Sequence, residues 1–120
     1  MAISAHSANE ETFTHDVLNA PIPVLVHFWA PWCGLCRMIE PLLAKLAAEW
    51  GGQLRLISVN ADENLKLANA YQLKTLPTLV LFDGGVALHR LERFHSTDDL
   101  RLALGDLHIA LERLTMSCML

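Results

Sequence analysis

The sequence predicts an α/β fold in which helices cover both faces of a central sheet. Helical and strand patterns alternate in the order α, β, α, β, α, β-hairpin, α, and such alternation requires a sheet between helical layers. The 120 residues, of which 52% are hydrophobic, are enough to build one substantial core. Without a repeat or linker, we expect one domain over residues 1–120, with a core at about 5–113 and a short C-terminal tail at 115–120.

The composition argues against several classes of protein. A net charge of −4 without a basic block is unlike a nucleic-acid-binding surface. We see no apolar run long enough to span a membrane and no secretory signal near the N-terminus. Three cysteines in such a chain indicate the reducing cytosol, so we expect a cytoplasmic protein that binds neither nucleic acid nor membrane.

The N-terminal part predicts a short edge strand at 4–7 and then a helix. Asn9 is a good helix N-cap because its side chain can accept a hydrogen bond from the first turn. Pro21 and Pro23 end this helix. Its apolar face consists of Phe13, Val17 and Leu18.

A buried strand and a long helix form the centre of the prediction. The strand at 24–29 is short, β-branched and aromatic. The helix runs from Cys33 to about Trp50, with a kink expected at Pro41, and a glycine pair at 51–52 ends it. Its buried stripe is formed by Leu42, Leu43, Leu46 and Ala47.

The C-terminal half predicts a short helix, a hairpin and a last helix. The short helix begins at Asp62 or its neighbour, and the tight turn at 83–85 joins the hairpin strands. Ser96 and Asp99 resemble a capping box for the last helix. The strands are at 54–59, 79–82 and 86–91, and the apolar stripe of the last helix is Leu100, Ala103, Leu104, Leu107, Leu111 and Leu114.

Two cysteines, Cys33 and Cys36, stand where the first long strand meets the long helix. Unpaired backbone N–H groups and the helix dipole stabilise an anion at a helix N-terminus, so the Cys33 thiol should ionise easily. We therefore expect Cys33 to be the attacking sulfur and Cys36, one turn further on, the resolving one. The same spacing also fits half of a structural zinc site, which needs two more ligands, or two inert buried thiols.

The sequence resembles the thioredoxin family over roughly residues 5–113. The matching residues are Phe28-Trp29-Ala30, Trp32-Cys33-Gly34, Cys36, Pro41 and Leu76-Pro77-Thr78. The resemblance implies a thioredoxin fold, with a mixed sheet of four to five strands flanked by four helices. It also implies that the Leu76–Pro77 peptide is cis and faces the two cysteines.

The resemblance implies a thiol–disulfide oxidoreductase that reduces protein disulfides, with roles in electron transport and cell redox homeostasis. Cys33 would form a mixed disulfide with the substrate, and Cys36 would resolve it, leaving a redox-active Cys33–Cys36 disulfide. A thioredoxin reductase or another reductant would regenerate the dithiol. An extended substrate segment would pair with the Leu76 backbone. The expected substrate-binding residues are Trp32, Gly34, Leu35, Leu76, Pro77, Arg93 and Phe94.

Leu35 is the first departure from the family pattern, which usually has proline there. Leucine restores a backbone N–H near the sulfurs, and hydrogen bonds to a thiolate favour the reduced form. We therefore predict a weaker reductant than an ordinary thioredoxin.

His27 and Ser58 replace the buried aspartate and its lysine partner that the family usually has. Histidine could accept the Cys36 proton, since its unperturbed pKa is about 6.5. The alternative is a neutral core histidine without a role in proton transfer, because burial disfavours imidazolium.

The segment Glu92-Arg93-Phe94-His95 replaces a small glycine-containing loop of the family. Its larger side chains should narrow the docking groove, and Arg93 would either favour acidic partners or remain solvated. His6, His15, His89, His95 and His108 have no metal-ligand spacing, and we expect them on the surface. Cys118 is expected to be a free thiol.

We therefore expect a disulfide reductase that needs no cofactor and no metal and acts as a monomer. Two alternatives remain. One is a more oxidising dithiol protein, either isomerase-like or a redox sensor. The other is a protein-binding module with the same fold and dispensable cysteines, because fold alone does not settle function.

Overall fold

A mixed five-stranded sheet forms the centre of the computed structural model, which describes residues 6–119, with side chains to residue 114. The strand order is β1-β3-β2-β4-β5, with β1, β3 and β2 parallel and β4 antiparallel to both β2 and β5. The strands are β1 (His6–Ser7), β2 (Val24–Trp29), β3 (Arg55–Asn60), β4 (Thr78–Asp83) and β5 (Val86–Leu91). The predicted α/β class and mixed sheet are thus confirmed; the predicted strand positions 4 and 5 lie outside the described residues.

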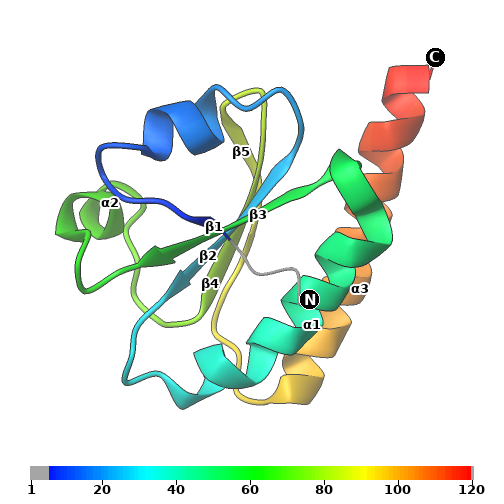
Figure 1. Ribbon diagram of the computed structural model, residues 1–120. Helices are drawn as coiled ribbons and strands as arrows, with labels where there is room; N and C mark the ends of the chain where they lie inside the picture. Colours follow the sequence, from blue (N-terminus) through cyan, green and yellow to red (C-terminus); the bar gives the residue numbers. More distant parts are fainter. Residues whose placement is uncertain (1–5, 120) are drawn as a thin grey trace.

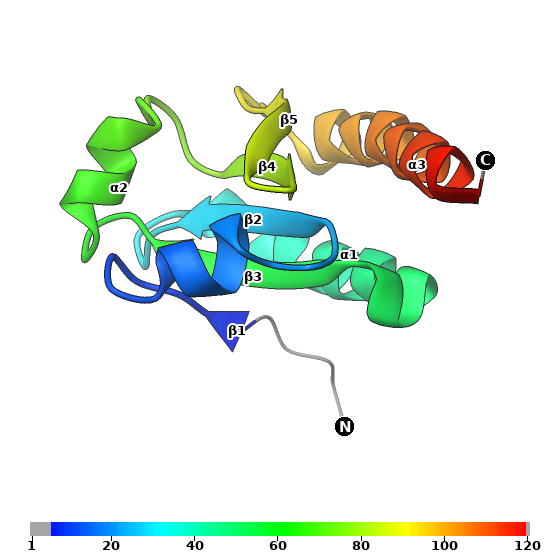
Figure 2. The same cartoon turned by 90° about the horizontal axis from the view of Figure 1, so that it is seen from above.

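Helices cover both faces of this sheet. Helices α1 and α3 lie together on one face, whereas α2 and the blue segment η1 lie on the other (Figures 1 and 2). The helical elements are η1 (Thr14–Leu18), α1 (Gly34–Trp50), η2 (Gly51–Gln53), α2 (Leu65–Ala70) and α3 (Thr97–Met119). In the described part of the chain, no helix has the length and apolar character needed to cross a bilayer.

Each face of the sheet has its own hydrophobic core. The core beneath α1 and α3 is mainly aliphatic, and its central side chains are Leu25, Ile39, Leu43, Leu79, Leu81, Leu100, Leu107 and Leu111. The opposite core is aromatic: Phe13, Phe28, Tyr71 and Phe82 form ring pairs with centroids 5.6–5.9 Å apart. Because side chains alternate along a strand, His27 shares the face of Leu25 and points toward α1.

The predicted apolar stripes are largely buried. Leu43, Leu46 and Ala47 of α1 are buried, and Leu42 is half-buried against the same core. Leu100, Leu107 and Leu111 of α3 are also buried, whereas Ala103, Leu104 and Leu114 are half-buried.

Three element ends differ from the prediction. Asn9 Oδ1 accepts hydrogen bonds from the Glu11 and Thr12 amides, at 2.8 and 3.0 Å, but only the turn at 14–18 then winds, as a π-helix. Helix α2 starts after Asn64 instead of Asp62, because the Asp62 amide donates to Asn60 Oδ1 at 2.9 Å in a turn.

The third difference is at the last helix. Ser96 Oγ accepts from the Asp99 amide at 3.2 Å, as in a capping box, but Asp99 Oδ2 accepts from the His95 amide instead of that of Ser96. Helix α3 continues to Met119, so residues 115–119 extend the helix instead of forming a separate tail. The predicted free thiol of Cys118 lies outside the described side chains.

Candidate active site

Cys33 and Cys36 form a disulfide at the N-terminus of α1, with Cα atoms 5.3 Å apart. Cys33 is the N-cap: its backbone is extended, and its Sγ accepts a hydrogen bond from the Cys36 amide at 3.1 Å. This sulfur therefore takes the place that a serine or aspartate oxygen usually has at a helix start. Both residues are buried, with Cys33 5% and Cys36 2% exposed.

Trp32 and Leu35 border this sulfur pair. Trp32 is 69% exposed, and its indole N–H donates to Asp62 Oδ2 at 2.9 Å, which ties the loop before α1 to the end of β3. Gly34 is exposed, whereas Leu35 packs on the aliphatic core. The exposed indole ring of Trp32 next to Cys33 offers an apolar surface on which a polypeptide can dock.

The Leu76–Pro77 peptide is cis, as the resemblance implies. Thr78 pairs with Phe28 at the end of β2 that leads to the cysteines, so Pro77 lies at the same end of the sheet. The loop before α1 and the yellow segment before α3 also lie there (Figure 1). Pro77 itself is buried and Leu76 is half-buried.

Arg93 is joined to this loop through its backbone, because the Arg93 amide donates to Thr75 Oγ1 at 3.3 Å. The Arg93 side chain is 69% exposed, with Nε 3.9 Å from Glu92 Oε1. Phe94 is half-buried against the aliphatic core, as is Leu35. The structure therefore brings two predicted groove segments, 75–77 and 92–94, together.

His27 is buried beneath the cysteines, with 2% of its surface exposed. Its strand neighbours are Ser58 on β3 and Leu79 on β4. Its Nε2 makes no hydrogen bond with any residue in the described part of the chain. Burial lowers the pKa of His27 to about 4, so the ring is neutral at neutral pH.

A cavity of about 160 Å³ lies between this histidine and Cys36. It is lined by His27, Trp29, Cys36, Arg37 and Glu40. The structure thus brings together His27 and Cys36, the two residues of the proton-transfer hypothesis.

Comparisons with known proteins agree with this geometry. The family model described as Thioredoxin matches residues 4–105. The chain is 43% identical to "Thioredoxin 1" of Nostoc sp. over 68% of this chain and 77% of the relative. It is 42% identical to "Thioredoxin 1" of Synechococcus elongatus, over 71% and 78%. The chain belongs to the thioredoxin family. "Thioredoxin M-type, chloroplastic" of Chlamydomonas reinhardtii is also 42% identical, over 68% of this chain and 58% of the relative.

Membership of the thioredoxin family defines the chemistry of the Cys33–Cys36 pair. The protein is a thiol–disulfide oxidoreductase that reduces protein disulfides by dithiol–disulfide exchange. Its partners are disulfide-containing proteins and a reductant that restores the dithiol.

The backbone of Arg93 has a conformation that is unusual for a residue other than glycine. Its φ of 64° lies in the left-handed region, where a Cβ atom is crowded. The resemblance places a glycine-containing loop here, and glycine adopts this conformation freely. The sequence comparison with the family could reveal the larger side chain but not the strained backbone.

Sequence reasoning missed Asp62 and Glu40 as parts of this thioredoxin's site. The sequence indicates Asp62 only as a helix start, and its bond to Trp32 depends on how β3 and α1 lie in space. Glu40 had a local signal: it follows Cys36 by four residues on a helix, a spacing that places side chains on one face.

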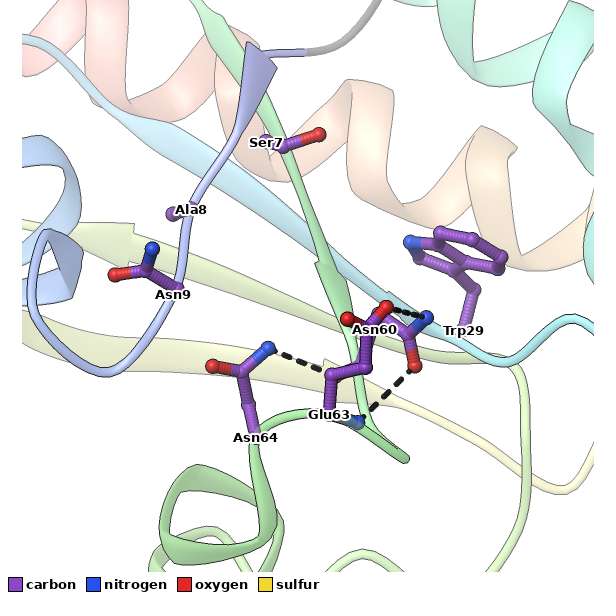
Figure 3. Close-up of a pocket in the computed structure, with 7 residues that line it drawn as sticks. All are labelled: Ser7, Ala8, Asn9, Trp29, Asn60, Glu63 and Asn64. Atoms are coloured by element: carbon purple, nitrogen blue, oxygen red, sulfur yellow. Dashed lines mark hydrogen bonds between the residues drawn. The ribbon is translucent and has the colours of Figure 1, made fainter.

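A second, larger hollow of about 380 Å³ lies on the other side of Trp29. Figure 3 shows the side chains that line it, with Asn60 hydrogen-bonded to both Glu63 and Asn64. Asn60 Nδ2 donates to Glu63 Oε1 at 2.8 Å, and Asn64 Nδ2 donates to the Asn60 carbonyl at 2.9 Å. These groups satisfy one another and hold the turn between β3 and α2, so we assign this hollow no part in the chemistry.

The remaining histidines are on the surface, as predicted. His6, His15, His89 and His95 are exposed. His108 is also at the surface, with 43% of its side chain exposed, although its Nε2 lies 2.7 Å from Glu112 Oε1 and its ring lies 5.4 Å from that of Trp50. Among the described side chains, no three histidine, cysteine or acidic residues are placed to hold a metal ion.

Proposed function

We propose that Cys33 is the nucleophile and Cys36 the resolving cysteine of this disulfide reductase. The observation that carries this assignment is the hydrogen bond from the Cys36 amide to Cys33 Sγ at the N-terminus of α1. A thiolate at Cys33 gains a charge-assisted hydrogen bond and the favourable end of the helix dipole. Cys36, buried beneath it, gains neither.

The reaction proceeds by two exchanges of sulfur. The Cys33 thiolate attacks one sulfur of the substrate disulfide, forms a mixed disulfide and releases the other substrate sulfur as a thiolate. Cys36, once deprotonated, attacks Cys33 Sγ. The Cys33–Cys36 bond forms as the bond to the substrate breaks, and a two-electron reductant then restores the dithiol.

The substrate binds in an extended form along the groove between Trp32 and the 75–77 loop. Its backbone pairs with that of Leu76, while Gly34, Leu35, Pro77, Arg93 and Phe94 complete the border. The hydrogen bond from the Arg93 amide to Thr75 Oγ1 supports this assignment, because it joins segment 92–94 to the 75–77 loop. Arg93 favours substrates with an acidic residue near the disulfide.

The second candidate function is that of an isomerase-like protein or a redox sensor, in which the cysteine pair has a higher reduction potential than in an ordinary thioredoxin. Leu35 favours it, since this residue supplies an N–H in the first turn of α1 that proline would lack. Thioredoxin reductase remains the proposed partner for regeneration. The proposed working form is a cytoplasmic monomer, folded as one domain.

Turnover of a disulfide-containing protein with dithiothreitol as reductant tests the function. We expect multiple turnovers for the parent chain and background reduction for a variant with both Cys33→Ser and Cys36→Ser. If the parent also showed only background reduction, and the double variant kept the parent's function in cells, the protein-binding module would replace the reductase. The reduction potential of the pair, measured against glutathione, then separates reductant from isomerase-like poise.

A further inference from the structure

We propose that Glu40 accepts, through water in the cavity beneath the cysteines, the proton that Cys36 loses before it resolves the mixed disulfide. This inference rests on the proposed resolving role of Cys36. It adds a proton acceptor that lies on the same helix as the cysteines.

The cavity has room for water, and its largely apolar lining includes hydrogen-bonding groups from His27, Arg37 and Glu40. Its volume of about 160 Å³ exceeds the roughly 10–15 Å³ needed to hold one water molecule. His27 Nε2 is buried in its wall without a hydrogen-bond partner among the described residues. Buried polar atoms are almost always hydrogen-bonded, so a water that bonds to Nε2 explains both the cavity and the orphaned nitrogen.

Elimination among the five lining residues points to Glu40 as the acceptor. Arg37 stays protonated and donates to the Pro31 carbonyl, while the Trp29 indole can only donate. Cys36 is the source of the proton. His27 would have to become a cation while 2% exposed, and burial already lowers its pKa to about 4.

Glu40, in contrast, is exposed to solvent and carries a carboxylate, a group that can accept a proton. When a proton moves from Cys36 to this carboxylate, the summed charge of the cavity wall does not change, and the proton then passes on to bulk solvent. Residues four apart on a helix lie on the same face, and this spacing places Glu40 one turn after Cys36. The strand residues that pair with His27, Ser58 and Leu79, are uncharged, so Arg37 is the other charged side chain of the cavity wall.

The step balances in protons and electrons. The Cys36 thiol gives its proton to the water, which gives one to the Glu40 carboxylate. The Cys36 thiolate attacks Cys33 Sγ, and the substrate leaves as a thiolate. Protonated Glu40 then releases its proton to solvent. His27 positions the water by bonding to it and stays neutral throughout.

Reaction of the reduced chain with 5,5′-dithiobis(2-nitrobenzoate) tests this proposal, because it separates the two sulfurs. A first release of coloured thiolate reports attack by Cys33, and a second, intramolecular release reports attack by Cys36. Both phases are followed by stopped flow from pH 5.5 to 8.5. The variant is Glu40→Gln, and Glu49→Gln is the matched control, since Glu49 is exposed on the same helix near its other end.

We expect Glu40→Gln to leave the first phase within about twofold and to slow the second by about tenfold or more near pH 6.5, as for loss of a general base. Its second phase should then rise about tenfold per pH unit toward the ordinary thiol pKa of about 8.5, whereas the parent varies less. Glu49→Gln should match the parent in both phases.

An unchanged second phase in Glu40→Gln would overturn the proposal. So would equal slowing in Glu49→Gln, which indicates a general charge effect, or equal slowing of both phases, which indicates altered geometry. A parent chain without any second phase would instead refute the resolving role of Cys36, so the two failures are distinguishable.

Discussion

Cys33 and Cys36 lie three residues apart but in opposite environments. Cys33 Sγ is the cap of α1 and accepts an amide hydrogen bond, whereas Cys36 borders a cavity with a neutral, buried histidine. One environment stabilises an anion before any substrate arrives. The other requires the proton to be moved first. We infer that this difference sets the proposed order of action, in which Cys33 attacks before Cys36.

Single cysteine variants should have the largest effect on activity, because each removes one of the two sulfurs. We expect Cys33→Ser to reduce turnover of a disulfide substrate to background. Cys36→Ser should still attack once and then accumulate as the mixed disulfide, because nothing resolves it. Mass spectrometry of the protein under non-reducing conditions detects the adduct. An adduct on Cys33→Ser instead would reverse the assigned roles.

Replacing His27 should change how stability depends on pH. Its pKa is about 4 in the fold and about 6.5 in the unfolded chain, so the unfolded chain binds more protons between these values. The contribution of His27 to the free energy of unfolding is therefore fully present above pH 6.5. It falls by about 3 kcal/mol as the pH drops toward 4.

The variant His27→Leu should lose this part of the pH dependence, because leucine fills the site without titrating. Urea unfolding at pH 7 and pH 4.5 measures it as the difference between variant and parent, in which the shared carboxylates cancel. His89→Gln, at an exposed position of β5, is the control and should follow the parent. Parallel curves for His27→Leu and the parent would contradict the burial argument.

Changing Leu35 tests whether its backbone N–H, in the first turn of α1, affects the reduction potential of the cysteine pair. We expect Leu35→Pro to lower the reduction potential by about 30 mV, or 1.4 kcal/mol, because one N–H near the thiolate is lost. Leu35→Ala keeps the N–H and should stay within experimental error of the parent. Equilibration with glutathione measures all three. A potential that stayed the same or rose in Leu35→Pro would show that this N–H does not set the poise.

The smallest effect is expected at Arg93, on the substrate side of the comparison. Arg93→Gly should raise the free energy of unfolding by about 0.5 kcal/mol, since relief of the left-handed strain exceeds the added entropy of the unfolded chain. Arg93→Ala keeps the Cβ atom and the strain, and should not stabilise. Urea unfolding at pH 7 compares them. Equal stability of the two variants would mean that the φ of 64° costs nothing.

The sequence predicted the elements that local patterns encode. The β2 strand, helix α1 and the apolar stripe of α3 each have a clear period. The hydrogen bond from Trp32 to Asp62 joins residues 30 positions apart, and no local pattern encodes such a contact. Likewise, the left-handed Arg93 and the cavity at His27 depend on how loops and helices meet.

The N-cap position of Cys33 has a consequence for the timing of each cycle. As a thiolate, Cys33 Sγ holds the Cys36 amide by a charge-assisted bond, whereas a sulfur bound to substrate is uncharged and holds it more weakly. We therefore expect the first turn of α1 to loosen when the mixed disulfide forms, which is when Cys36 must move toward Cys33. Formation of the mixed disulfide therefore weakens the bond that restrains Cys36, the residue that then releases the substrate.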